Sequence, residues 1–372
     1  MGVFGEVRVL ELGRVFSGPL CGMALADMGA RVLKVERPGV GDESRRFGLH
    51  RAGGQSCYFN ALNRNKKSVA LDLAEPADRA LFEDLVRRAD VLVHNWIQAS
   101  LDRLGFSWEA VHALNPRLIY CAISGYGAAT SFASRPAQDI IAQALSGFMS
   151  LTGERDGPPL KSAIPVVDYA TGLYAAFAIS AALFERTSTG EGQLIRLSLL
   201  QTAVAMTSFA ASEHLSCGAS PARTGNRHPS ICPYNLYATA DGYVVMAVAN
   251  DAMWGRCREA LGLLDDTRFA TNRQRLEHQD DLEALIEARM AALGTAEVVA
   301  LLEAHKVSCA QVNPVGGAFE SPPVAELGMI ADTGAARFVG SPVCRPGAKP
   351  VPLRAPPALG QDEDEVRATL DW

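Results

Sequence analysis

The sequence has no excess of positive charge. Its 372 residues include 35 Lys and Arg against 41 Asp and Glu, a formal net charge of −6. Nothing in this balance draws the chain to nucleic acid or to an anionic membrane, so neither is predicted as a partner. An anionic ligand would have to be held by a local group of bases.

Several motifs are also missing. The eight cysteines form no C-x-x-C pair, so neither a zinc site nor a thioredoxin-type site is predicted. The absence of G-x-S-x-G, H-E-x-x-H and Walker motifs leaves hydrolase, zinc protease and NTPase functions without support. The first residues lack a signal-peptide pattern, and the apolar stretch 169–184 is expected to be too short to span a bilayer. We expect a soluble, cytoplasmic protein.

What is present is an alternation of short apolar runs with helical segments. The runs read as strands, with helices between them, and lie at 7–12, 31–36, 68–73, 91–96 and 117–124. This order is typical of a mostly parallel sheet with helices on both faces, so the predicted class is α/β.

The chain changes character after Gly125, where long Ala-rich segments predict helices. Residues 193–216 carry one charge among their first twenty and are interpreted as a helix buried on several sides, suited to an interface between chains. A hairpin is predicted around Asp241 and Gly242. The predicted domains are a large domain in 1–224, a small domain in 225–315, and a segment, 316–372, that returns to the large domain.

The first candidate site is the loop after the opening strand. Gly13, Gly18 and Gly22 would let the backbone approach a ligand, and Glu36 ends the second strand where a dinucleotide fold places a ribose-binding acid. The spacing is not G-x-G-x-x-G, so a tight turn is favoured over an NAD site. Seven bases follow and would suit a polyphosphate or form a solvated face: Arg37, Arg45, Arg46, Arg51, Arg64, Lys66 and Lys67.

The second candidate is Asp168, an acid entering an apolar helix. It could cap the helix, or it could act as a nucleophile that attacks a thioester. Gln138 and Asp139 could mark an ordinary helix start, and His228 could be an ordinary loop histidine.

The sequence resembles the class III CoA-transferases, the family that includes formyl-CoA transferase and α-methylacyl-CoA racemase. The similarity follows family order through blocks such as VLELGRVFSGPLCGMALADMGARVLKVERPGVGDESR, FNALNRNKKSVALDL, SAIPVVDYATGLYAA and PYNLYATADGYVVMAVAN. It covers most of the chain. The resemblance implies a Rossmann-like large domain, a smaller α+β domain and an interlocked homodimer.

The resemblance also implies a site. Asp168 falls on the catalytic aspartate, which forms an anhydride with the acyl group and a thioester with CoA. The CoA contacts implied are Phe16, Ser17, Arg37, Leu71, Asp72, Leu73, Ala74, Asn95, Trp96, Ile97, Arg103, Arg135 and Gln138. Asp139, Asn226, Arg227 and His228 are predicted to bind the acyl group or to support the site. Coenzyme A enters as a thioester substrate, with no permanently bound cofactor.

Departures from the family pattern refine the prediction. Gln138 stands where racemases carry a histidine, and it cannot shuttle a proton. Residues 224–234 replace the tetraglycine loop of formyl-CoA transferase, which makes formyl or oxalyl substrates doubtful. The stretches at 97–99 and after Gly127 also differ. We therefore expect a CoA-transferase acting on succinyl-CoA or another dicarboxylyl-CoA and a free acid. The alternatives are an acyl-CoA α-epimerase and a non-catalytic CoA-binding protein.

Overall fold

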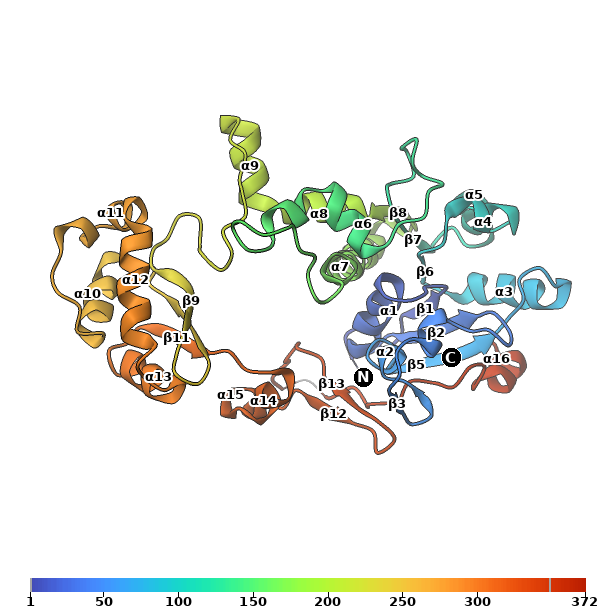
Figure 1. Cartoon of the computed structure of the whole chain (residues 1–372). Coiled ribbons are helices and arrows are strands. Elements are labelled where there is room, and N and C mark those ends of the chain that lie inside the picture. Colours follow the sequence, from blue (N-terminus) through green and yellow to red (C-terminus); the bar gives the residue numbers. More distant parts are fainter. Residues whose placement is uncertain (1, 348) are drawn as a thin grey trace. The chain divides into compact units, whose positions relative to one another are not determined.

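The computed structural model describes residues 2–347 and 349–372, which form two compact units (Figure 1). The larger unit contains residues 1–148, 161–219 and 328–372, and the smaller contains 149–160 and 220–327. The smaller unit therefore takes in a short segment, 149–160, that the sequence pattern gave no reason to separate.

The larger unit is built on a six-stranded parallel sheet in the order β5-β2-β1-β6-β7-β8. This confirms the predicted α/β class. The strands are β1 Arg8–Glu11, β2 Arg31–Glu36, β5 Lys66–Ala70, β6 Val91–His94, β7 Ile119–Ser124 and β8 Leu194–Ser198. Two short hairpins join β3 Arg51–Ala52 to β4 Gln55–Ser56 and β12 Ile330–Asp332 to β13 Arg337–Val339.

Helices cover both faces of the sheet, because side chains alternate between the faces along each strand. Leu10 points into a core with Phe82 and Tyr120, while its neighbour Val9 points into a second core with Leu25 and Ile179. The helices of this unit are α1 Ser17–Asp27, α2 Cys57–Asn60, α3 Pro76–Arg88, α4 Gln98–Arg103, α5 Trp108–Leu114, α6 Asp139–Leu145, α7 Val166–Thr189, α8 Leu199–Met206, α9 Ser208–Cys217 and α16 Glu363–Thr369.

The C-terminal segment is part of the larger unit. Asp362 accepts a hydrogen bond from the Ser68 amide at 2.9 Å, and the Trp372 indole donates to the carbonyl of Arg31 at 3.0 Å. Residues 341–360 contain six prolines, and the described residues of this stretch form no helix, because proline interrupts helical hydrogen bonding.

The smaller unit is α+β, with a three-stranded antiparallel sheet in the order β11-β10-β9. Asp241 and Gly242 form the turn between β9 and β10, which confirms the predicted hairpin. Its elements are β9 Tyr234–Ala238, β10 Tyr243–Ala247, β11 Ser308–Gln311, α10 Asp251–Ala260, α11 Asn272–Glu277, α12 Gln279–Met290, α13 Thr295–Ala304, α14 Val315–Glu320 and α15 Pro322–Glu326.

One expectation about helices was wrong. Residues 194–198 form an edge strand, β8, rather than the start of a helix. Phe209 and Leu215 in α9 are exposed in the single chain, so the burial of this segment at an interface between chains stays a prediction. The apolar helix α7 has 24 residues and by length and composition could cross a membrane. One face of it packs instead against α1 and β7.

Candidate active site

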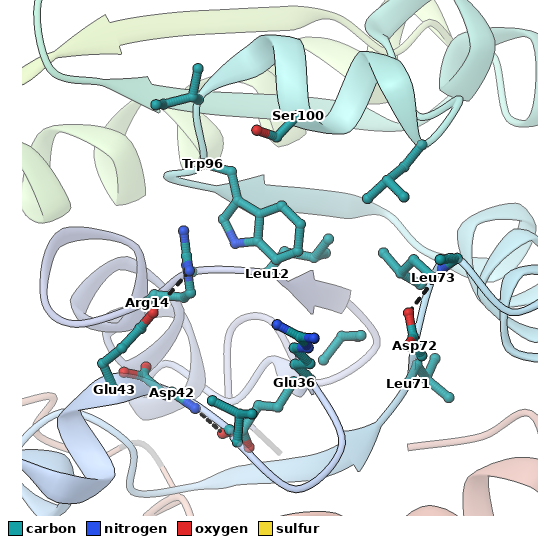
Figure 2. A pocket seen from close by; sticks show the side chains of 18 residues that line it. Leu12, Arg14, Glu36, Asp42, Glu43, Leu71, Asp72, Leu73, Trp96 and Ser100 are labelled. Atoms are coloured by element: carbon teal, nitrogen blue, oxygen red, sulfur yellow. Dashed lines mark hydrogen bonds and ion pairs between the residues drawn. The ribbon is translucent and has the colours of Figure 1, made fainter. Parts of the chain in front are cut away.

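Two adjoining cavities lie at the carboxyl ends of the parallel strands, where open α/β sheets bind ligands. The first cavity, of about 400 Å³, is formed by residues that follow β1, β2, β5 and β6. Figure 2 shows Trp96 above it, Arg14 and Glu43 along one side, and the stretch Leu71–Leu73 along the other. The predicted residues that line it are Arg37, Leu71, Asp72, Leu73, Ala74, Trp96 and Ile97.

The second cavity, of about 300 Å³, contains Asp168. Five of the predicted residues line it: Phe16, Ser17, Asn95, Gln138 and Asp168. Arg14 and Glu43 line both cavities and form an ion pair at 2.9 Å. Sequence reasoning missed both of these residues, although Arg14 lies only two positions before the predicted contact Phe16.

The carboxylate of Asp168 is not used to cap its own helix. Asp139, at the start of α6, accepts hydrogen bonds from the amides of Val167 and Asp168 at 2.8 and 3.0 Å. Pro165, the N-cap residue of α7, supplies no side-chain cap. Because Asp139 satisfies the first amides of the helix, the capping interpretation of Asp168 is wrong and its carboxylate faces the second cavity.

The environment of Asp168 favours its protonated form. Burial raises the pKa of Asp168 to about 7, repulsion from Asp139 adds to the rise, and a hydrogen bond with Ser17 partly offsets it. Asp168 lies in the first turn of α7, where the helix dipole favours an ionised carboxylate. Desolvation and the neighbouring negative charge outweigh that effect.

The loop between β1 and α1 is held by the side chain of Asn95, which follows β6. The Arg14 amide donates to Asn95 Oδ1 at 2.8 Å, and Asn95 Nδ2 donates back to the Arg14 carbonyl at 2.7 Å. Added side-chain carbons at Gly13 and Gly18 would each come within 2.8 Å of the other residue's backbone, so these glycines allow the loop to close on itself. The favoured tight-turn interpretation agrees with this packing.

Three of the seven bases in the basic run are paired with acids inside the protein. Arg45 pairs with Glu36 at 2.7 Å, Lys66 with Glu11 at 2.7 Å, and Arg64 with Asp27. The interpretation of the whole run as a polyphosphate site is therefore wrong. Glu36 is likewise engaged, by Arg45 and by the Ser68 hydroxyl at 2.7 Å, which removes it as a ribose ligand.

The remaining predicted residues lie elsewhere. Arg103, on α4, and Arg135, which stacks on Phe132 at 4.4 Å, lie outside both cavities. In the smaller unit Arg227 is ion-paired with Asp280 and Glu283, each at 2.6 Å. Its neighbours there are Asn226, which is exposed, and His228, which accepts a hydrogen bond from the Ser230 amide.

The larger unit combines an open parallel sheet, a cavity at the strand ends and a carboxylate in an adjoining cavity. This arrangement is typical of enzymes that bind a nucleotide-like ligand beside a reacting group. The model of CoA-transferase family III matches residues 5–363, and the chain belongs to that family. The protein is a class III CoA-transferase, an enzyme whose substrates are CoA thioesters.

Characterised relatives cover nearly the whole chain. The succinate–glutarate CoA-transferase of Agrobacterium fabrum is 38% identical, over 98% of this chain and 95% of that protein. The human succinyl-CoA:glutarate CoA-transferase is 34% identical, over 97% and 84%. A CaiB/BaiF family protein from Brucella suis, solved by crystallography, superposes with a TM-score of 0.91 at 35% identity over 100% of both chains.

Proposed function

We propose that this enzyme moves CoA from succinyl-CoA, or another short dicarboxylyl-CoA, to a free carboxylic acid through covalent intermediates on Asp168. The observation that carries the proposal is the Asp168 carboxylate, which Asp139 frees from helix capping and which faces the second cavity beside Ser17. The first cavity would hold the nucleotide end of CoA, so that its pantetheine arm passes Arg14 and Glu43 on the way to Asp168.

The chemistry runs through two kinds of intermediate. Asp168 attacks the thioester carbonyl, the C–S bond breaks, and CoA thiolate leaves an aspartyl–acyl anhydride. The thiolate then attacks the aspartyl carbon, which releases the donor acid and forms an aspartyl-CoA thioester. The acceptor carboxylate attacks that thioester to give a second anhydride, and the thiolate attacks the acceptor carbon. Asp168 is regenerated without any need for ATP.

The choice of a dicarboxylyl donor is supported by the relatives, which act on succinate and glutarate by name. Within the predicted loop, the charge of Arg227 is already balanced by Asp280 and Glu283. We therefore assign contact with the distal carboxylate to Asn226 and His228, with Arg227 holding the loop.

The test is to incubate the enzyme with succinyl-CoA and a panel of carboxylic acids and to follow new acyl-CoA by mass spectrometry. Hydroxylamine should trap Asp168 as a hydroxamate. Asp168→Asn and Asp168→Ala should each lose transfer by at least about a thousandfold. Full transfer by Asp168→Ala would reject the nucleophile.

Isotopes separate this proposal from its alternatives. An acceptor labelled with ¹⁸O in its carboxylate should pass one label to Asp168 and, in the next turnover, to the released donor acid. An α-epimerase would instead exchange the α-hydrogen of the acyl group in deuterated water without a second acid. Exchange of that hydrogen with no ¹⁸O transfer would favour the epimerase.

We also propose that the enzyme is a homodimer whose chains interlock. One face of α7 packs on the rest of the larger unit. The opposite face carries Leu173, Phe177 and Phe184, whose exposed fractions are 46%, 72% and 80%. Exposed apolar faces of this kind mark contact surfaces, and a second copy of the chain is the occupant that the family resemblance favours.

A further inference from the structure

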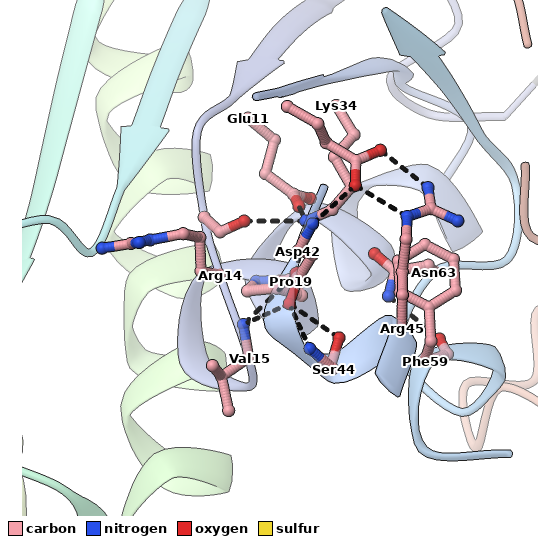
Figure 3. Close-up of polar contacts among 12 residues, drawn as sticks. Glu11, Arg14, Val15, Pro19, Lys34, Asp42, Ser44, Arg45, Phe59 and Asn63 are labelled. Atoms are coloured by element: carbon pink, nitrogen blue, oxygen red, sulfur yellow. Dashed lines mark hydrogen bonds and ion pairs between the residues drawn. The ribbon is translucent and has the colours of Figure 1, made fainter. Parts of the chain in front are cut away.

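Four charged side chains are completely buried beneath the loop that joins β1 to α1 (Figure 3). Lys34 Nζ lies 2.9 Å from Glu11 Oε1 and 2.9 Å from Asp42 Oδ2, and Lys66 Nζ lies 2.7 Å from Glu11 Oε2. Buried charges are costly unless each is paired and hydrogen-bonded. The two carboxylates balance the two ammonium groups.

The network also contacts the backbone of the loop above it. Lys34 donates to the carbonyl of Gly13 at 2.7 Å, and Lys66 donates to the carbonyl of Pro19 at 2.7 Å. Asp42 accepts the amide hydrogen of Val15, with its two oxygens at 3.1 and 3.2 Å from the nitrogen. Three of the four buried charges therefore fix main-chain atoms of residues 13–19.

The contact to Val15 falls on a strained residue. Val15 has φ of 65°, in the left-handed region, which a β-branched residue adopts only when its surroundings impose it. The residues that follow it, Phe16 and Ser17, line the second cavity together with Asp168, whose pKa the Ser17 side chain lowers. The backbone turn at Val15 thus sets where Ser17 stands relative to Asp168.

We propose that Asp42 is a positioning residue: its buried carboxylate holds the Val15 amide in the left-handed turn and so keeps Ser17 and the loop amides aligned with Asp168. This inference rests on the proposed reaction at Asp168. Asp42 itself is 1% exposed and is held by Lys34 and by the amide and hydroxyl of Ser44 at 2.9 and 2.7 Å. Asp42 is among the residues that line the first cavity, but its side chain is completely buried, so its carboxylate acts through the loop and not on the substrate.

Asp42→Asn is the decisive variant. An amide has the same size but only one acceptor oxygen, so its NH₂ group must face either Lys34 or the amides of Val15 and Ser44, donor against donor. The acylation rate of Asp168, measured by rapid quench with succinyl-CoA, should fall at least about tenfold, because small misplacements at a reacting centre are costly. The Kd for free CoA should change by less than about threefold, since the first cavity keeps its other walls.

A matched control and a rescue separate positioning from stability. Asp27→Asn removes another buried carboxylate of the larger unit, one that pairs with Arg64 and makes no contact with the loop at residues 13–19. This control should leave the acylation rate within about twofold of the wild type. Val15→Gly, added to Asp42→Asn, should restore at least about half of the lost rate on a logarithmic scale, because glycine takes positive φ without strain. A folded double variant with no recovery would overturn the proposal.

Hydrogen exchange gives a readout that does not depend on turnover. The peptide spanning residues 13–20 should exchange faster in Asp42→Asn than in the wild type or in Asp27→Asn. Unchanged exchange there, with an unchanged acylation rate, would also overturn the proposal. If Asp42→Asn fails to fold, Ser44→Ala removes one support of the same carboxylate and should give a smaller change in the same direction. A wild type that forms no adduct on Asp168 would refute the proposed function, while the exchange data would still decide the role of Asp42.

Discussion

Asp139 and Asp168 are neighbouring carboxylates, since Asp139 accepts the amide hydrogen of Asp168, but they have different roles. Asp139 is buried and accepts two helix amides, which stabilise its negative charge. Asp168 has the cavity in front of it and no such support, and its pKa is raised to about 7. A fixed charge beside a carboxylate of raised pKa is a common way to give two acids separate roles.

The raised pKa predicts how the stability of Asp168→Asn depends on pH. The pKa of about 7 in the folded protein lies above the usual aspartate value of 3.8, so the native state binds more protons than the unfolded state between these pH values. The stabilisation from protonated Asp168 is complete below about pH 4 and is lost as the pH rises through 7. The free energy of unfolding of Asp168→Asn, relative to that of the wild type, should therefore be higher at pH 8 than at pH 5, as measured by urea unfolding. An equal difference at both pH values would contradict the shift.

Asp139→Asn tests the electrostatic part of that shift. Removing the negative charge beside Asp168 lowers its pKa, while the remaining amide oxygen can still accept the Val167 and Asp168 amides. The rate of acyl-enzyme formation, which requires ionised Asp168, should rise with pH through about 7 in the wild type. In Asp139→Asn the midpoint should move to lower pH. A midpoint that stays or rises would show that Asp139 does not act through its charge.

At the scale of elements, the close packing of α1 on α7 sets the geometry of the second cavity. Gly172 of α7 faces the Ser17 carbonyl, and an added Cβ would come within 2.7 Å of it and 3.0 Å of Leu20. Gly172→Ala should push the helices apart, at a cost of about 1–3 kcal/mol in the free energy of unfolding, and lower the transfer rate as Ser17 moves.

Gly255 provides the matched control for this change. It lies in α10 of the smaller unit, and an added Cβ there meets nothing within 4 Å. Gly255→Ala should stabilise the protein by about 0.5–1 kcal/mol, through helix propensity alone, and leave transfer unchanged. Chemical unfolding and initial rates measure both variants. A stable, fully active Gly172→Ala enzyme would mean that the α1–α7 contact has room to relax.

The elements also show where sequence reasoning succeeds and where it stops. The alternation of apolar runs with helical segments predicts the parallel sheet, and a central strand such as β1 is buried on both faces, with Val9 in one core and Leu10 in the other. The strand β8 was missed because residues 194–198 run directly into α8, which begins at Leu199, with no glycine or proline between them.

The site was predictable only in part, because a sequence does not show which charged side chains meet in the folded protein. Residues such as Leu71–Ala74 and Trp96 were implied by the family resemblance, and the topology agrees with them, since parallel strands bring their ends to one edge. The ion pairs formed in the folded protein cannot be predicted from the sequence pattern in this way. A run of bases in the sequence gives no sign that Lys66 meets Glu11 inside the protein, or that Asp139 takes over the helix cap from Asp168.

For the whole molecule, the exposed face of α7 is the main feature that a single chain leaves unexplained. Its apolar residues recur on one side of the helix, opposite the side that packs on α1 and β7. A face this apolar is costly in water, and a two-fold interface would bury the same patch from each copy. The wild type should therefore sediment as a dimer.

Phe177→Glu tests the proposed dimer. A carboxylate at this position, 72% exposed in the chain, would be buried without a partner at the interface, so the variant should sediment as a monomer at concentrations where the wild type is dimeric. Leu264→Glu is the control, because Leu264 is 90% exposed in the smaller unit and lies outside α7. It should sediment like the wild type. Dimers that persist in Phe177→Glu would place the interface elsewhere. A monomeric wild type would refute the proposed dimer, and the experiments on Asp168 would still test the proposed chemistry.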